Sequence, residues 1–311
     1  MRFPVDDSCV LLEGPWSHRF VNANGTRLHV VEAGTGPLVL MLHGFPEFWY
    51  AWHQQLPALA EAGYRAVAVD MRGCGASDKP PRGYDAYTMA ADVVGLIRAL
   101  GERSATLVGT GQGGMLAWAA ACFHPKLIQR LVVINAPHPL RMRAALATDP
   151  RGQLTAALPL LKFQIPRYEH VLTRSNAAMV CEYLERWGSP AWVRSRDFVD
   201  YERHCRQAML IPQASFCTLE AYRWSVRSVL RPQGFRFIRL MQQPVTSPTL
   251  QLHGAEDPSV LARTAHGSGR YVTAEYEWRL LDGAGHFPHQ EAPETVTSEI
   301  LRWAKNGSST R

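Results

Sequence analysis

No hydrophobic run in this 311-residue sequence is long enough to cross a membrane. The longest unbroken apolar stretch, Met115–Phe123, has nine residues, about half of what a spanning helix needs. The first residues also lack the apolar segment of a secretory signal, because Asp6 and Asp7 follow closely on Arg2. We therefore expect a cytoplasmic protein that makes no membrane contact.

Clustered cysteine and clustered positive charge are missing as well. The six cysteines include no Cys-x-x-Cys pair and no metal-ligand spacing, so we expect free thiols and no metal or other cofactor. The net charge is +6 and the pI is near 9.1, but no run of Lys and Arg concentrates this charge, which argues against a nucleic-acid partner. With 46% hydrophobic and 19% charged residues, the composition is that of a folded globular protein.

What the sequence does contain is an alternation of short β-branched runs and helical patterns, which predicts an α/β fold with a mostly parallel sheet. The predicted strands are 28–32, 38–42, 66–70, 105–108, 131–135, 248–253 and 276–281. Between them, 87–100 and 113–123 are predicted to be helices. Thr88 is the expected N-cap of the first helix, and Gly101 its expected C-cap.

The strand patterns disappear between residues 138 and 235, where Arg, aromatic residues and helical stretches such as 179–187 and 215–229 are frequent. We therefore predict an α/β core formed by residues 1–137 and 236–311, interrupted by a helical cap at 138–235. A final helix is expected at 294–305. This division fits the chain length as one large unit with an insertion.

The segment Ala105–Met115, ATLVGTGQGGM, leads from a predicted strand through a glycine-rich turn into a helix. Its Gly109-x-Gly111-x-x-Gly114 spacing fits a dinucleotide-binding fingerprint. That fingerprint also needs an acid about 20 residues further on to bind a ribose, yet no Asp or Glu follows before Asp149. We favour a nucleophile elbow, a sharp strand–turn–helix bend between small residues, with Gly111 at the nucleophile position.

Five further motifs occur in the chain, two before the elbow and three after it. They are His43-Gly-Phe-Pro-Glu-Phe-Trp-Tyr-Ala-Trp52, Asp70-Met-Arg-Gly-Cys-Gly-Ala-Ser-Asp-Lys-Pro80, Asn135-Ala-Pro-His-Pro139, Leu252-His-Gly-Ala-Glu-Asp257 and Gly283-Ala-Gly-His286-Phe-Pro. With the elbow, they closely resemble the epoxide hydrolase branch of the α/β-hydrolase fold, a relative of the haloalkane dehalogenases. The resemblance covers residues 20 to 304 or so and implies a mostly parallel central sheet flanked by helices, with an inserted helical cap.

The resemblance also implies catalytic roles. In this family an Asp on the elbow attacks an epoxide to form an alkyl ester, and a His supported by a late acid activates the water that hydrolyses the ester. By position, His286 is the base and Asp257 is its orienting acid, with Glu256 as the alternative acid. The backbone N–H groups of Phe45 and Gln112 would form the oxyanion site.

This sequence departs from the family pattern at the nucleophile. Gly111 has no side chain, so no covalent ester can form there, and Thr110 and Gln112 stand where His and Trp are common in the family. The elbow nucleophile adopts a positive φ, which glycine reaches without the penalty of a Cβ atom. We therefore expect the fold to tolerate Gly111.

Four functional alternatives stay open. In the first, His286 and Asp257 activate water for epoxide opening or a related hydrolysis. In the second, the same pair deprotonates a substrate hydroxyl or carbon acid, as in an isomerase, a lyase or a cyclase. The third is a small-molecule binding protein without catalysis, and the fourth is an epoxide hydrolase in which Asp was replaced by Gly in the laboratory. The intact pair favours the first two.

The predicted cap supplies the remaining candidates. In the resembled family two cap tyrosines hold and protonate the epoxide oxygen, and Tyr222 in TLEAYRW matches one of them. The other is expected just before Phe163-Gln164, but that stretch reads Leu158-Pro-Leu-Leu-Lys162, so another tyrosine would have to replace it. The candidates for that replacement are Tyr168, Tyr183 and Tyr201. The candidates for an apolar substrate pocket are His43, Trp49, Trp187, Trp192 and Trp224.

Positive charge gathers in the predicted cap. Residues 138–235 contain 13 Arg and one Lys against eight Asp and Glu, a surplus equal to the net charge of +6 of the whole chain. A solvated helical surface accounts for this surplus, and steering of an anionic substrate is the alternative. We expect an apolar small-molecule substrate, with aromatic or anionic character left open, bound by a monomer or a homodimer.

Overall fold

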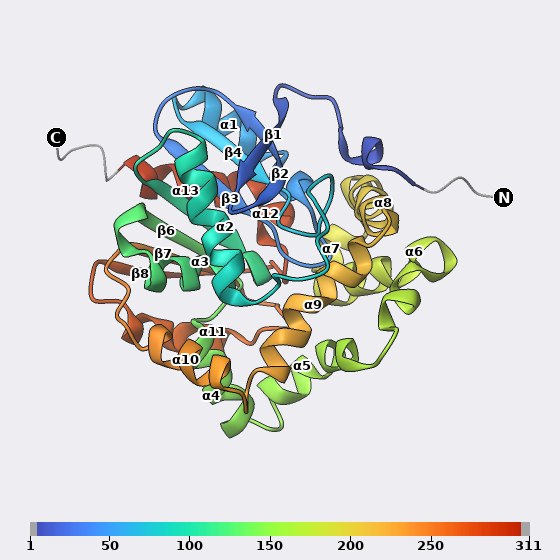
Figure 1. Ribbon diagram of the computed structural model, residues 1–311, viewed down its shortest axis with the longest axis vertical. Helices are drawn as coiled ribbons and strands as arrows, with labels where there is room; N and C mark the ends of the chain where they lie inside the picture. Colours follow the sequence, from blue (N-terminus) through green and yellow to red (C-terminus); the bar gives the residue numbers. More distant parts are fainter. Residues whose placement is uncertain (1–4, 306–311) are drawn as a thin grey trace.

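The computed structural model describes residues 5–305, which form an eight-stranded sheet with the strand order β1-β2-β4-β3-β5-β6-β7-β8. Figure 1 shows this sheet with helices around it. The strands are β1 Ser17–Ala23, β2 Thr26–Ala33, β3 Leu38–Leu42, β4 Arg65–Val69, β5 Ala105–Thr110, β6 Ile128–Ile134, β7 Thr249–Gly254 and β8 Tyr276–Leu281. The α/β-hydrolase fold predicted from the sequence is confirmed.

The sheet is parallel except at one edge. From β4 through β3 to β8 every neighbouring pair is parallel, whereas β2 runs antiparallel to both β1 and β4. Strand β1 is not among the predicted strands, because most of its side chains are exposed and it lacks a buried apolar stripe. It joins β2 through Asn24 and Gly25, which have φ of 48° and 72°, the backbone that a tight hairpin requires.

Two hydrophobic clusters lie on opposite faces of the sheet. One cluster includes buried side chains of α2 Ala86–Ala99 and α3 Gly111–Phe123, and the other includes those of α1 Gln55–Glu61 and α13 Pro293–Lys305. The predicted N-cap of α2 is wrong. Asp85 caps this helix, because its carboxylate accepts hydrogen bonds from two backbone N–H groups, including that of Thr88.

The segment expected to form the cap contains helices and no strand in the described structure. Its helices are α4 Pro139–Thr148, α5 Gln153–Leu161, α6 Tyr168–Trp187, α7 Pro190–Val193, α8 Arg196–Leu210, α9 Ala214–Arg227 and α10 Pro232–Met241. Helix α10 runs across position 235, so the helical segment ends later than the sequence pattern indicates. Short helices α11 Ala262–His266 and α12 Pro288–Glu291 belong to the C-terminal part of the chain. Within residues 5–305 we find no helix with the length and apolar character of a membrane span.

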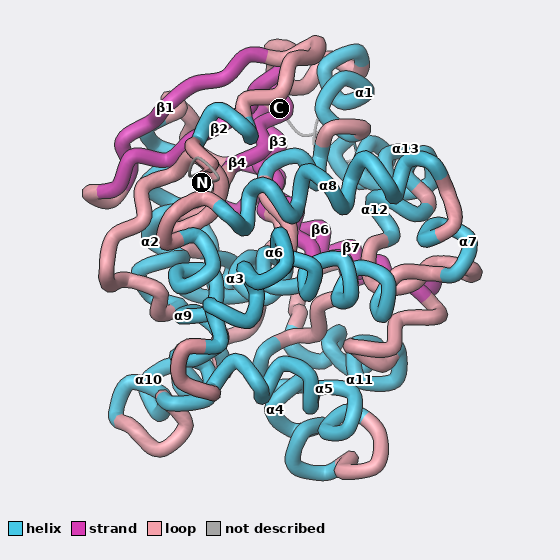
Figure 2. Tube along the Cα trace, turned by 90° about the vertical axis from the view of Figure 1, so that its right-hand side faces the viewer, coloured by secondary structure: helices cyan, strands magenta, loops and turns pink. Residues whose placement is uncertain are grey.

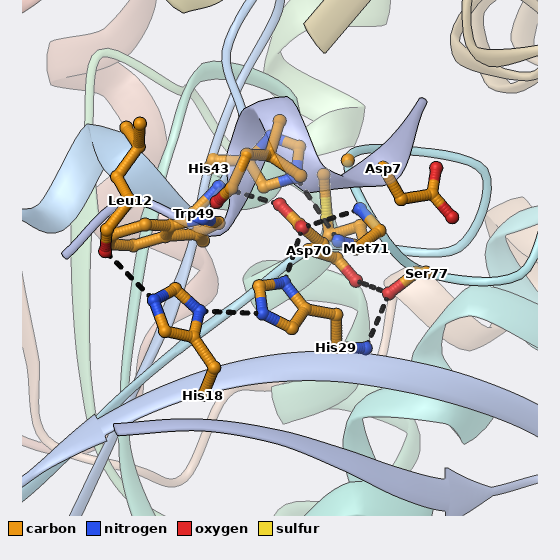
Figure 3. Close-up of polar contacts among 12 residues, drawn as sticks. Asp7, Leu12, His18, His29, His43, Trp49, Asp70, Met71 and Ser77 are labelled. Atoms are coloured by element: carbon orange, nitrogen blue, oxygen red, sulfur yellow. Dashed lines mark hydrogen bonds and ion pairs between the residues drawn. The ribbon is translucent and has the colours of Figure 1, made fainter. Parts of the chain in front are cut away.

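A buried chain of hydrogen bonds fastens the N-terminal segment to the sheet (Figure 3). His18 bonds to the carbonyl of Leu12 at 2.9 Å and to His29 at 3.0 Å, and His29 bonds to Asp70 at 2.7 Å. The Asp70 carboxylate also accepts the backbone N–H of Trp49 at 2.8 Å. This chain of contacts links the segment before β1 to β1, to β2 and to the loop after β4.

Candidate active site

The predicted site residues come from loops that meet at one edge of the sheet. Strands β3, β5, β6, β7 and β8 are neighbours and run parallel, so their carboxyl ends lie side by side. In open α/β sheets this edge is where ligands bind. The residues that follow these five strands are His43, Gly111, Asn135, Asp257 and His286.

Gly111 begins helix α3 directly after β5, with a φ of 50°. A Cβ atom at this position would lie 3.4 Å from Nε2 of His286 and 3.8 Å from Cα of Gly44. At Gly109 and Gly113 a Cβ atom would meet backbone atoms at 2.5 Å and 2.4 Å, so both must stay glycine for the bend to close. This is the sharp strand–turn–helix geometry expected of a nucleophile elbow, and a side chain at position 111 would face His286.

His286 is oriented by Asp257. Its Nδ1–H donates to Oδ2 of Asp257 at 2.7 Å, and both residues are buried. Burial alone would lower the pKa of His286, but the charge and hydrogen bond of Asp257, with the carboxylates of Glu47 and Glu291, outweigh it and raise the pKa above its usual range. Glu256, the alternative acid, is exposed.

Asn135 holds the acid in place from the end of β6. Its amide nitrogen donates to Oδ2 of Asp257 at 2.6 Å and to the carbonyl of Gly285 at 2.9 Å, and its amide oxygen accepts the N–H of Gly254 at 2.9 Å. Asn135 is fully buried and has a φ of 49°. One side chain therefore ties together the loops after β6, β7 and β8.

The loop that carries His286 is bonded to the cap. The backbone N–H of His286 donates to the carbonyl of Trp187 at 2.8 Å. Glu291 accepts the N–H groups of Gly285 at 2.6 Å, Phe287 at 2.8 Å and Ser189 at 3.0 Å. The His286 loop is thus held by contacts with Trp187 at the end of α6, with Ser189 through Glu291, and with α12.

A second buried carboxylate, that of Glu47, lies next to the Gly44–Phe45 turn. Glu47 accepts hydrogen bonds from His289 at 2.8 Å, from the hydroxyl of Tyr201 at 2.5 Å and from the N–H of Gly44 at 3.1 Å. Burial disfavours ionisation of Glu47, but His289 and Tyr201 outweigh it and hold the pKa of this carboxyl below its usual range. Glu47 therefore places a buried negative charge near His286.

His43 serves the backbone of the same turn. Its Nδ1 bonds to the carbonyl of Gly44 at 2.8 Å, and its Nε2 accepts the N–H of Met71 at 3.2 Å. Burial lowers the pKa of His43, so the ring is neutral. With both ring nitrogens used, His43 shapes the loop beside the site and has no ring nitrogen left for a substrate.

An aromatic layer from the cap covers Phe45. Tyr183 of α6 and Tyr222 of α9 lie with ring centroids 5.4 Å and 5.9 Å from that of Phe45. Trp187 contacts both Tyr183, at 4.9 Å, and His286, at 5.4 Å. The structure therefore brings these cap side chains to the carboxyl edge of the sheet.

The three candidates for the second cap tyrosine differ in their partners. The hydroxyl of Tyr201 is bonded to Glu47. The hydroxyls of Tyr168 and Tyr183 are 3.0 Å apart, and burial raises the pKa of Tyr183. Among these three, the ring of Tyr183 contacts both Phe45 and Trp187.

Three of the tryptophans expected in the pocket differ in their contacts. Trp49 is a core residue whose indole N–H donates to the carbonyl of Val10 at 2.7 Å. Trp224 packs against Tyr87 and Phe237, on the side of the cap that faces α2 and α10. Trp192 contacts Phe287, the neighbour of His286, at 5.6 Å. The rings of Trp49 and Trp224 therefore pack other elements together in the described structure.

Several polar residues of the site were not among the sequence candidates. Glu47, Asn135 and His289 are buried and hydrogen-bonded, and Glu291 binds three backbone groups. The sequence signal that could have indicated Glu47 and Asn135 is that both lie inside motifs shared with the resembled family, at 43–52 and 135–139. Within residues 5–305, no group of three or more His, Cys, Asp or Glu side chains is arranged to hold a metal ion.

Comparison with known proteins shows the family to which the chain belongs. The family model described as alpha/beta hydrolase fold matches residues 37–293. The chain is 33% identical over 296 residues to the AB hydrolase superfamily protein YfhM of Bacillus subtilis (strain 168), covering 93% of this chain and 98% of that protein. It is 32% identical over 292 residues to Epoxide hydrolase 4 of Mus musculus, covering 92% of this chain and 78% of that protein.

Solved structures with the same architecture include epoxide hydrolases. The Bacillus megaterium epoxide hydrolase in complex with an inhibitor superposes with a TM-score of 0.80 at 25% identity, covering 92% of this chain and 100% of that chain. The Vigna radiata epoxide hydrolase VrEH1 superposes with a TM-score of 0.78 at 26% identity, covering 94% and 98%. The similarity therefore extends over core and cap alike.

The role of Asn135 gives a stability prediction. Asn135→Ala removes three buried hydrogen bonds and leaves a Cβ atom at positive φ, so we expect it to lower the free energy of unfolding by about 3–4 kcal/mol. Asn135→Gly removes the same bonds without the backbone penalty and should cost about 1 kcal/mol less. Urea unfolding of both variants, with the exposed Asn22→Ala as control, measures the difference. Equal stability of Asn135→Ala and Asn22→Ala would contradict the assignment.

Proposed function

Because this chain belongs to the α/β-hydrolase fold family, we propose that it is a hydrolase of the epoxide-hydrolase type in which His286 activates water directly. The observation that carries this proposal is the position of Gly111, where a Cβ atom would lie 3.4 Å from Nε2 of His286. Two of the relatives named epoxide hydrolase are similar to this chain over 92% and 93% of its length. The elbow supplies no nucleophilic side chain here, so water acts as the nucleophile.

The base in this proposal is His286. Asp257 accepts the proton on Nδ1, which leaves Nε2 to take a proton from a water placed beside Gly111. Outside the backbone of the elbow itself, Nε2 of His286 and Cα of Gly44 are the atoms within 4 Å of a Cβ atom built at this position, and we place the water between Gly111 and His286. The backbone N–H of Gln112, in the first turn of α3, and that of Phe45 would stabilise the negative charge that develops on this oxygen.

The epoxide oxygen needs a proton donor as the ring opens. We assign the role of proton donor to the hydroxyl of Tyr222. The hydroxyl of Tyr183 takes the place of the second cap tyrosine, which the sequence lacks near Lys162. Both rings contact Phe45. The water oxygen then bonds to an epoxide carbon, the ring C–O bond breaks, and its oxygen takes the tyrosine proton to give a diol. An apolar substrate fits the aromatic layer formed by Phe45, Trp187 and the two tyrosines.

The pH dependence follows from the state of His286. A general base must be neutral, and the pKa of His286 is raised by Asp257, so kcat/KM for an aryl epoxide should fall with decreasing pH through a midpoint above the ordinary value of 6.5. His286→Gln should lower kcat/KM by about 10²–10⁴-fold and abolish its fall with decreasing pH. The control is His124→Gln at the far end of α3.

Initial rates over a panel of aryl and aliphatic epoxides measure both effects. A rate unaffected by His286→Gln would contradict the proposal. Absence of turnover across the panel, together with ligand binding that His286→Ala leaves unchanged, would identify a binding protein without catalysis.

Restoring the elbow carboxylate tests the position of Gly111. Gly111→Asp would place a nucleophile against His286, and we expect epoxide turnover to rise by at least about tenfold through a covalent ester. Gly111→Asn is the matched control, because it has the same size and the same backbone cost at φ 50° but no nucleophile. Rapid-quench mass spectrometry of the protein should detect the ester in the Asp variant alone. Equal rates for the Asp and Asn variants would contradict the expected elbow geometry.

A further inference from the structure

Helix α10 lies toward the end of the molecule opposite β1 and α1 (Figures 1 and 2). Apolar side chains are exposed where α9 leads into α10. Leu230 is 86% exposed and Phe235 is 59% exposed. Val226 and Val229 in the same stretch are 42% and 37% exposed. These four exposed side chains lie within ten residues, at the end of α9, in the turn that follows it and at the start of α10.

The same stretch carries unbalanced positive charge. No Asp or Glu occurs between Glu220 and Glu256. Four arginines in this interval are exposed: Arg227, Arg231, Arg236 and Arg239. Arg227 is 4.0 Å from Glu220, and the guanidinium of Arg236 lies over the ring of Tyr87. Within the described chain, Arg231 and Arg239 have no carboxylate partner, in contrast to Arg302 of α13, which pairs with both Glu277 and Glu299.

We propose that these eight side chains, which we call the α9–α10 tip, dock the protein on an anionic lipid surface. A lipid surface offers negative headgroups to the arginines and an apolar layer to Leu230, Phe235 and the two valines. Nucleic acid would match the arginines but would leave the exposed apolar side chains without a partner. The tip therefore fits a surface that is negatively charged outside and apolar beneath.

Docking at the tip departs from the absence of membrane contact expected from the sequence. That expectation rested on the lack of a spanning helix, whereas the tip would only lie at the headgroup layer. The sequence already placed the surplus charge in the segment 138–235, and the structure assigns part of it to one exposed turn. The proposal does not depend on the proposed function, because none of the eight side chains belongs to the catalytic group.

Co-sedimentation of the full chain with vesicles tests the proposal. We expect binding to vesicles of phosphatidylcholine mixed with phosphatidylglycerol, little binding to phosphatidylcholine alone, and loss of binding in high salt because the Debye length shortens. Arg231→Gln combined with Arg239→Gln should weaken binding by about fivefold per arginine. Leu230→Ser should weaken it by about tenfold.

Matched controls come from exposed residues elsewhere on the chain. Arg103→Gln removes an exposed arginine outside the tip, and Leu280→Ser replaces a leucine of β8 that is 47% exposed. Neither should change vesicle binding. Circular dichroism of each variant confirms that these surface replacements leave the fold intact.

Four results would overturn the proposal. These are no binding to anionic vesicles, equal binding to neutral vesicles, equal losses in the tip and control variants, and tip-dependent binding to duplex DNA without binding to vesicles. Self-association abolished by Leu230→Ser, with no vesicle binding, would identify a second copy of the chain as the occupant instead and would likewise overturn it.

Discussion

The candidate site depends on one constraint, the alignment of five parallel strands whose carboxyl ends meet at a single edge. Their order places the loop after β5 between those after β3 and β6, with the loops after β7 and β8 next in line. Gly111, Asp257 and His286 are far apart in sequence, yet each follows its strand by only a few residues. Changes that shift the register of β5, β7 or β8 would therefore separate Gly111, Asp257 and His286 from one another.

Buried charges reinforce this alignment. Asp257 is fully enclosed and accepts hydrogen bonds from His286, Asn135 and two backbone N–H groups, so its negative charge is stabilised without solvent. Glu47 adds a second buried carboxylate, paired with His289. Both carboxylates raise the pKa of His286. The site is therefore arranged to hold a base that becomes a cation when it takes a proton, whatever substrate it serves.

Much of the fold was predictable because its signals are local. The buried strands read as runs of β-branched residues, and β3 and β8 have the predicted bounds. Strand β1 could not be predicted from such a run, because an edge strand with exposed side chains needs no apolar stripe, and its signal was the Asn24-Gly25 turn. The N-cap of α2 was misplaced because Asp85 and Thr88 are both capping residues, three positions apart.

The parts of the candidate site that could be predicted are those where a sequence motif determines the backbone conformation of a loop. The positive φ of Gly111 and the nearness of His286 to Asp257 follow from motifs after three different strands. The side-chain environment did not follow, because it depends on which face of each cap helix packs against the core. Trp49 and Trp187 cannot be distinguished by residue type, yet one is bonded to Val10 and the other contacts His286.

The central claim is that water, and not the protein, supplies the new oxygen of the product in the first turnover. A single turnover of the native protein with excess enzyme over an aryl epoxide in ¹⁸O-labelled water, followed by mass spectrometry of the diol, measures this directly. Direct activation by His286 predicts one ¹⁸O atom in the first diol formed. An unlabelled first diol, with ¹⁸O retained in the protein, would show that an ester with a protein carboxylate forms and would contradict the claim.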